Sequence, residues 1–144
     1  MTAQGIAPEL PELPELSVED TRSEPAPPPL RASEARESAA AFVARLSPAP
    51  SARAVQNLVL LVSELVTNAI RYAGGVTALS FGADHRALHV RVVDPSPAHP
   101  QCRVPDLTGQ SGGFGWPMVL RLSSSVTVHR HGNQGKTILA TLAR

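Results

Sequence analysis

Residues 63–73 read SELVTNAIRYA, and they form the second half of the strongest helical pattern in the chain, roughly Ala52–Ala73. Apolar side chains recur every three or four residues along this pattern, which predicts one buried helix face. They are Leu58, Leu61, Val62, Leu65, Ala69 and Tyr72. Glu64, Asn68 and Arg71 stand at i, i+4 and i+7, so they share the other face. The stretch therefore predicts a helix with an apolar side for a core and a polar row on its other side.

The polar row contains two hard oxygen donors, Glu64 and Asn68, one helical turn apart. Mg²⁺ prefers octahedral oxygen ligands and keeps several waters, so one amide oxygen together with phosphate oxygens is sufficient to hold it. The Glu64 carboxylate can then orient or deprotonate a water or hydroxyl nucleophile, and Arg71 can meet a phosphate. The alternative is an ordinary solvated helix face, which the spacing alone does not exclude.

The segments around this helix predict a two-layer α/β sandwich of the α+β class. An earlier helical pattern begins near Ser33 and is ended by Pro48 and Pro50. After Gly74-Gly75, which ends the main helix, the apolar period changes to two and predicts strands. The later elements are expected at Val76–Phe81, Ala87–Val93, the helix Trp116–Leu122, Ser125–Arg130 and Lys136–Leu142. This order predicts a mostly antiparallel sheet covered by helices.

Three further positions are candidate binding residues. Asp94 ends a strand and opens a long loop over residues 95–113, which is either a functional lid or disordered. Gly113 and Gly115 stand just before a helix, where glycines let the backbone approach a ligand and free amides attract anions. Thr137, in the last strand, can support a base or a water. Each has an ordinary alternative: an Asp that starts a turn, a plain glycine turn, or a strand hydroxyl.

Composition indicates a small globular protein with an uneven charge. The chain has 144 residues, of which 42% are hydrophobic and 17% charged, and its formal net charge is +1. Residues 1–29 are acidic and rich in proline, so we expect a disordered tail before a single domain over residues 30–144. The single cysteine, Cys102, excludes an internal disulfide framework and a cysteine-based zinc site.

The sequence also indicates where the protein is located and which classes of partner it lacks. No apolar run approaches the roughly 20 residues of a membrane span, and the first residues lack the pattern of a signal peptide. We therefore expect a cytoplasmic protein with no membrane partner. No recognition-helix motif or basic stripe indicates direct binding to nucleic acid.

The stretch from Ser63 to Ala73 closely resembles the asparagine box of the GHKL (histidine-kinase-like) ATPase superfamily. Within that superfamily, residues 30–144 are similar to the anti-sigma factor serine kinases and to their stand-alone actinobacterial ATP-binding relatives. The resemblance implies a Bergerat-type fold that binds ATP and Mg²⁺. By the same resemblance, Asn68 corresponds to the Mg²⁺-binding asparagine and Glu64 to the general base. Arg71 occupies a position that is often basic in the family.

The resemblance also assigns roles to the later positions. Asp94 matches the aspartate that receives the adenine amino group. Gly113 and Gly115 match the glycine box beside the phosphates, and Thr137 matches the threonine near adenine in the last strand. The glycine box departs from the family at Phe114, where relatives often have arginine. A second departure is Trp116-Pro117, where relatives have small aliphatic residues.

The function that this resemblance implies is an ATP-dependent protein serine/threonine kinase that acts as an anti-sigma factor. Its substrate would be an anti-sigma antagonist protein, its other partner a sigma factor, and a homodimer is expected because such relatives often dimerise. The altered glycine box supports an alternative, a non-catalytic module that sequesters a sigma factor or antagonist without phosphoryl transfer. A third interpretation, the ATPase half of a histidine kinase, needs a long dimerisation helix with an acceptor histidine, and no segment predicts one.

Overall fold

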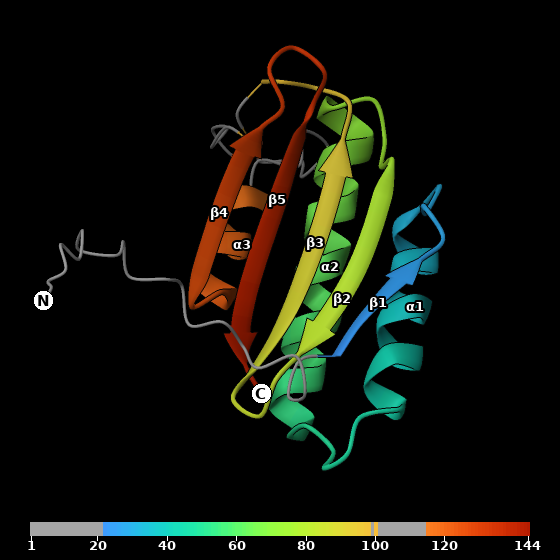
Figure 1. The fold of residues 1–144 in the computed structure, drawn as a ribbon, viewed down its shortest axis with the longest axis vertical. Helices are drawn as coiled ribbons and strands as arrows, with labels where there is room; N and C mark the ends of the chain where they lie inside the picture. Colours follow the sequence, from blue (N-terminus) through green and yellow to red (C-terminus); the bar gives the residue numbers. More distant parts are fainter. Residues whose placement is uncertain (1–21, 99, 101–114) are drawn as a thin grey trace, which may run out of the picture.

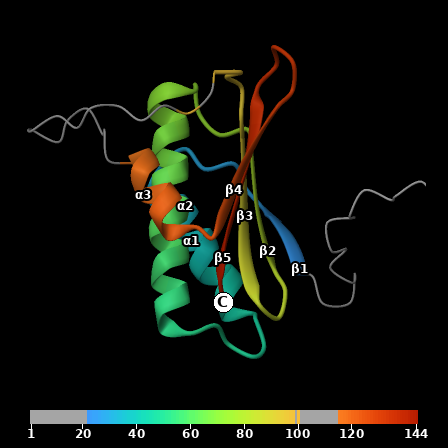
Figure 2. The same ribbon diagram turned by 90° about the vertical axis from the view of Figure 1, so that its left-hand side faces the viewer.

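The structure is a computed structural model that describes residues 22–98, 100 and 115–144. In this part of the chain three helices lie against one face of a five-stranded sheet, which gives two layers (Figure 1, Figure 2). The elements are β1 (Arg22–Ala26), α1 (Ala32–Ala44), α2 (Ala52–Tyr72), β2 (Ala78–Ala83), β3 (Ala87–Asp94), α3 (Gly115–Leu122), β4 (Ser125–Arg130) and β5 (Lys136–Ala143). The two-layer α+β fold predicted from the sequence is confirmed.

The sheet has the strand order β1-β2-β3-β5-β4, and every neighbouring pair is antiparallel. β3 lies at its centre, between β2 and β5. The register of β3 and β5 sets Asp94, the last residue of β3, opposite Lys136, the first residue of β5. Residues directly opposite each other on antiparallel strands project to the same face of a sheet. The fold therefore brings two positions 42 residues apart to one corner of the sheet.

α2 is the helix predicted by the stretch 63–73. The Ser51 hydroxyl caps its first turn and accepts a hydrogen bond from the Ala54 amide at 3.1 Å. The predicted apolar face is buried, with the addition of Ala54 and Val66. Tyr72 is the exception, since it is the last residue of the helix and is 37% exposed. The opposite face carries Glu64 and Asn68, which are both half-buried.

The core lies between the helices and the sheet. Its strand side consists of alternate residues of β2, β3 and β5, which include Leu79, Phe81, Leu88, Val90, Val92, Ile138, Ala140 and Leu142. Phe42 of α1 stacks on Phe81 of β2, with ring centroids 5.5 Å apart. Each fully buried side chain of this size contributes about 1.5–3 kcal/mol relative to exposure. The core therefore fixes α1 and α2 on the same face of the sheet as Asp94.

β1 is an edge strand, and it lies inside the segment that composition predicted to be a tail. It pairs with β2 from Arg22 opposite Ala83 to Ala26 opposite Leu79. The Glu24 carboxylate accepts a hydrogen bond from Arg45, which follows α1. Proline is tolerated at a sheet edge because one side of the strand needs no donor there. The boundary predicted at residue 30 is therefore too late, and the part of the tail prediction on residues 1–21 lies outside the described residues.

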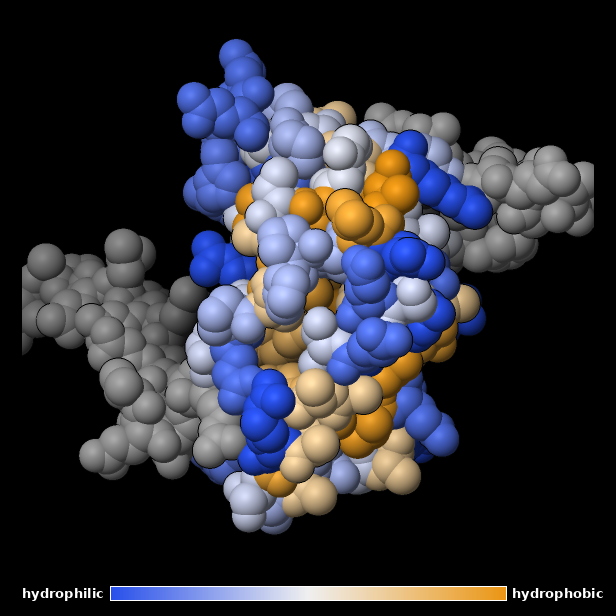
Figure 3. Space-filling model, turned by 90° about the vertical axis from the view of Figure 1, so that its right-hand side faces the viewer, coloured by the Kyte–Doolittle hydropathy of each residue, from blue (hydrophilic) through white to orange (hydrophobic). Residues whose placement is uncertain are grey.

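The side of the molecule with α1 and β1 carries apolar side chains in separate patches between polar ones (Figure 3). A groove on this part of the chain lies between prolines 27–29 and α1. Its α1 wall consists of Glu34, Glu37, Ser38 and Ala41. None of the candidate binding residues lines it, so it forms a separate feature of the surface.

The other predicted elements agree with the structure to within two residues at most boundaries. α1 begins at Ala32, α3 at Gly115, and β5 ends at Ala143. The largest shift is in β2, which runs from Ala78 to Ala83 instead of Val76–Phe81. Searched over its described residues, the chain contains no helix with the length and apolar character of a membrane span.

Candidate functional site

Glu64 lies where α2 meets the start of α3. A Cβ atom placed on Gly115, the first residue of α3, would stand only 2.9 Å from Glu64 Oε2. The glycine therefore makes room for the carboxylate. The first turn of a helix also favours negative charge, because its backbone N–H groups are unpaired and its dipole is positive there. The structure thus brings together two of the predicted site residues, Glu64 and Gly115.

Asn68 follows Glu64 by one turn of α2, and Arg71 lies further along the helix in its last turn. Asn68 is half-buried, whereas Arg71 is exposed. Just before this row, the Ser63 hydroxyl accepts a hydrogen bond from Arg36 of α1 at 3.0 Å, which links the two helices. The predicted polar row is therefore present on α2, with an amide and a carboxylate that are both partly accessible to a ligand.

Asp94 is buried at the end of β3, on the face of the sheet that the helices cover. Its Oδ1 accepts a hydrogen bond from the Ser96 amide at 2.9 Å and another from Lys136 Nζ at 3.0 Å. Lys136 Nζ also donates to the Ser96 carbonyl oxygen at 3.1 Å. The predicted base-binding carboxylate therefore belongs to a buried ion pair with a lysine.

Sequence reasoning chose Thr137 in β5 and missed Lys136. Adjacent residues of a strand project to opposite faces, so only one of the two can lie beside Asp94. The Thr137 hydroxyl instead contacts His131 Nε2 at 2.7 Å. The structure therefore separates Thr137 from Asp94. The signal that identifies Lys136 is its register opposite Asp94, which is available only once β3 and β5 are paired.

Two glycines hold the elements of this corner close together. A Cβ atom on Gly135, just before β5, would stand 2.3 Å from the Asp94 carbonyl oxygen. A Cβ atom on Gly74, just after α2, would be 3.4 Å from Pro95 Cγ. The end of α2, the end of β3 and the start of β5 therefore meet at one corner. The remaining predicted residue, Gly113, lies outside the described residues, as do Phe114 and most of the loop over residues 95–113.

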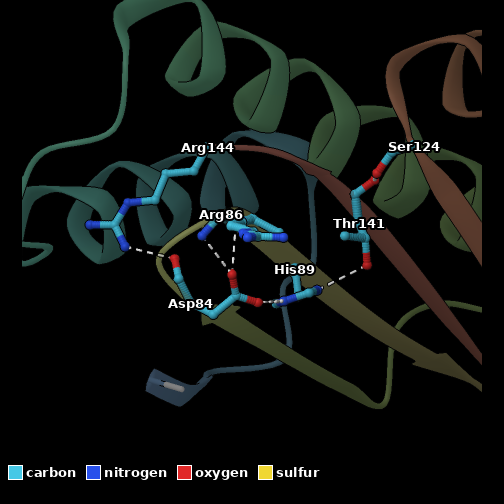
Figure 4. Close-up of polar contacts among 7 residues, drawn as sticks. Asp84, Arg86, His89, Ser124, Thr141 and Arg144 are labelled. Atoms are coloured by element: carbon cyan, nitrogen blue, oxygen red, sulfur yellow. Dashed lines mark hydrogen bonds and ion pairs between the residues drawn. The ribbon is translucent and has the colours of Figure 1, made fainter. Parts of the chain in front are cut away.

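A second polar cluster lies at the other end of β3 (Figure 4). Asp84 Oδ1 accepts hydrogen bonds from the Arg86 amide at 2.7 Å and from the next amide at 2.9 Å. The two ring nitrogens of His89 contact Asp84 Oδ2 at 3.0 Å and the Thr141 hydroxyl at 2.9 Å. Burial alone would raise the pKa of the Asp84 carboxyl, but these hydrogen bonds outweigh it and hold the pKa below its ordinary value.

This second cluster closes the β2–β3 hairpin and fastens β5 to it. The Arg144 guanidinium donates a hydrogen bond to the Asp84 carbonyl oxygen at 2.8 Å, and the Arg144 amide donates to the Arg86 carbonyl oxygen at 3.0 Å. Its groups satisfy one another within the cluster. We therefore assign it a structural role and place the candidate site at the Asp94 end.

The donor set at the Asp94 end and on α2 suits a nucleotide with a divalent cation. The Asn68 amide and Glu64 carboxylate supply hard oxygen atoms that suit Mg²⁺ together with phosphate oxygens. Asp94 and Lys136 supply a buried acceptor and a buried donor for a polar ring. α2 packs on both β3 and β5, so the two groups border the same layer of the structure.

Comparison with known proteins agrees with this chemistry. A family model described as a histidine kinase-like ATPase domain matches residues 25–142. Its match begins inside β1, which supports the inclusion of that strand in the folded domain. A comparison with curated proteins gives no match.

Proposed function

This chain belongs to the histidine kinase-like ATPase family, whose domain binds ATP, and we propose that it is an anti-sigma factor serine/threonine kinase. The substrate would be the hydroxyl group of an anti-sigma antagonist protein, with Mg²⁺ bound at Asn68. The observation that carries the proposal is the position of Glu64, one turn before Asn68 and directly against Gly115 at the start of α3.

In this proposal each residue has one task. The Asn68 amide oxygen would ligate Mg²⁺, and the bound metal would supply positive charge beside the phosphate oxygens. The oxygen of the partner's hydroxyl group bonds to the γ-phosphorus of ATP, and Glu64 accepts the proton of that hydroxyl group. The bond between the γ-phosphorus and the oxygen that bridges it to the β-phosphate breaks, and ADP leaves. Asp94 holds the base, and Arg71 remains a proposed phosphate contact.

Glu64→Gln tests the proposal because it keeps the shape of the side chain and removes the base. We expect calorimetry to show Mg²⁺-ADP affinity within about 3-fold of native. Transfer of labelled γ-phosphate to the antagonist should fall by about 10²–10⁴-fold, the usual contribution of a general base. Glu37→Gln, at an exposed position of α1, is the matched control and should leave both measurements unchanged.

The alternative function is a non-catalytic module that binds a sigma factor or antagonist. It is favoured by Trp116 and Pro117 in the first turn of α3, where the resemblance leads us to expect small aliphatic residues. Under this alternative, Glu64→Gln has no effect on control of the partner in cells. Unchanged transfer by the same variant would remove Glu64 from the catalytic role.

A further inference from the structure

The buried pair of Asp94 and Lys136 has an unusual position for an ion pair. Their side chains are 1% and 5% exposed, and they occupy paired positions at the ends of β3 and β5. Removing two charges from water is costly, and apolar side chains of similar size are often at least as stabilising. Stability alone is thus a weak reason for the pair, and a ligand that uses both groups is a better one.

The hydrogen-bonding capacity of the pair exceeds its internal contacts. An ammonium group has three donors, and Lys136 Nζ uses two of them, on Asp94 Oδ1 and on the Ser96 carbonyl oxygen. Both contacts to the Asp94 carboxylate that come from described residues converge on Oδ1. Among the described residues, no hydrogen bond reaches Asp94 Oδ2 or uses the third N–H group of Lys136 Nζ. The pair therefore presents an acceptor and a donor next to each other.

We propose that Lys136 is a specificity-determining residue that reads the base of the nucleotide beside the Asp94 carboxylate. This inference rests on the proposed ATP-binding function. The exocyclic amino group of a 6-aminopurine donates to the Asp94 carboxylate, and the Lys136 ammonium donates to the ring nitrogen beside that amino group. In the same orientation, a 6-oxopurine sets a carbonyl oxygen against the carboxylate and a ring N–H group against the ammonium, so the pair disfavours it.

The geometry of β5 supports Lys136 rather than its neighbour in this role. Thr137 lies on the opposite face and contacts His131, so its hydroxyl is not beside Asp94. Gly135 lies directly against the Asp94 backbone, which fixes the start of β5 and with it the position of Lys136. A base held by Asp94 therefore meets a cationic donor at this position.

The test compares ligands on the native full-length chain by calorimetry in the presence of Mg²⁺. The ligands are ADP, 1-deaza-ADP, 7-deaza-ADP and inosine diphosphate. A hydrogen bond with a charged donor is worth enough to predict that one of the two deaza analogues binds about 10- to 100-fold more weakly than ADP. Inosine diphosphate should bind weakly as well. Equal affinity for ADP and both deaza analogues would overturn the role of Lys136 and leave ATP binding intact.

Lys136→Met then assigns the effect to the lysine, because it keeps the length of the side chain and removes the donor. In this variant, the deaza analogue that binds the native protein more weakly than ADP should bind less than about 3-fold more weakly than ADP. If Lys136→Met does not fold, the comparison of ADP with the two deaza analogues on the native protein still decides. If the folded variant shows the same difference in affinity as the native protein, the inference is overturned. If the native protein does not bind ADP, the proposed function is overturned as well.

Discussion

Gly135 lies against the backbone of Asp94 so closely that a Cβ atom there would stand 2.3 Å from the Asp94 carbonyl oxygen. The backbone φ of Gly135 is 134°, a value that residues with a Cβ atom rarely adopt. The contact joins the turn before β5 to the end of β3 at the position where Lys136 meets Asp94. A glycine at this turn is therefore a condition for the buried pair.

Gly135→Ala should lower the free energy of unfolding by about 2–4 kcal/mol, because the new methyl group meets backbone that cannot move aside without breaking the strand pairing. Gly75→Ala is the control. It has a positive φ of 110° but nothing within 4 Å of its Cβ position, so it should cost about 1 kcal/mol. Urea unfolding of the two variants measures the difference. Equal losses would mean that the contact with Asp94 contributes nothing beyond backbone strain.

Asn68→Ala should remove the Mg²⁺-dependent part of nucleotide binding, because it deletes the proposed amide ligand of the metal. Calorimetry with ATP, with and without Mg²⁺, measures this effect. Asn57→Ala changes the same residue type on the same helix and should bind like the native protein. If Asn68→Ala retains the full response to Mg²⁺, the metal ligand lies elsewhere.

Gly115→Ala should act on Glu64 rather than on stability. The new methyl group meets the end of a flexible side chain, so the Glu64 carboxylate moves away at little cost. We expect phosphoryl transfer to fall by about 10-fold or more, since a displaced base loses its alignment, while ADP affinity stays within about 3-fold. Gly132→Ala, in a hairpin turn with open space around its Cβ position, is the control. Native transfer by Gly115→Ala would contradict the assignment of Glu64 as base.

Asp84→Asn should make stability less dependent on acid pH. The pKa of Asp84 is lower in the folded chain than in the unfolded chain, so the ionised carboxylate stabilises the fold above its ordinary pKa of about 3.8. That contribution is lost as the pH falls through the lowered, folded-state pKa. We expect the free energy of unfolding of the native protein to exceed that of Asp84→Asn by about 1 kcal/mol at pH 7, and this difference should shrink below about pH 4. Urea unfolding at several pH values measures it, and a constant difference across that range would contradict the cause.

Removal of residues 1–29 should destabilise the domain, whereas removal of residues 1–21 should spare β1 and its contacts. The protein without residues 1–29 loses the backbone hydrogen bonds between β1 and β2 and the hydrogen bond from Arg45 to Glu24. It should also expose part of Phe81 and Phe42, which line a pocket together with residues 24–27. Thermal unfolding of the two truncated proteins measures the effect. Equal midpoints would show that β1 adds no net stability.

Much of the fold could be predicted because its signals are local. The period of apolar residues in α2, the glycines after it and the alternation in β3 depend on neighbours a few positions away. The polar row of Glu64 and Asn68 follows from the same period. β1 could not be predicted in this way, because its acidic, proline-containing sequence resembles a disordered segment. It becomes a strand only through its pairing with β2.

The candidate site could be predicted only in part, because its contacts join distant segments. Glu64 and Gly115 are 51 positions apart, and nothing local to either indicates that they touch. The choice between Thr137 and Lys136 depends on which of two alternate residues faces Asp94. A shift of one residue in the strand pairing reverses that answer. The sequence pattern located the final strand, and the register decided which side chain belongs to the site.

The proline in β1 also affects how one copy of this protein can meet another. A row of unpaired N–H and C=O groups at a sheet edge is a template for strand addition by a second chain. Pro25 supplies no N–H group, so the row that β1 offers is interrupted at the fourth residue of a five-residue strand. Self-association by continuous strand pairing is thereby disfavoured at this edge. A homodimer of this protein would then use another surface.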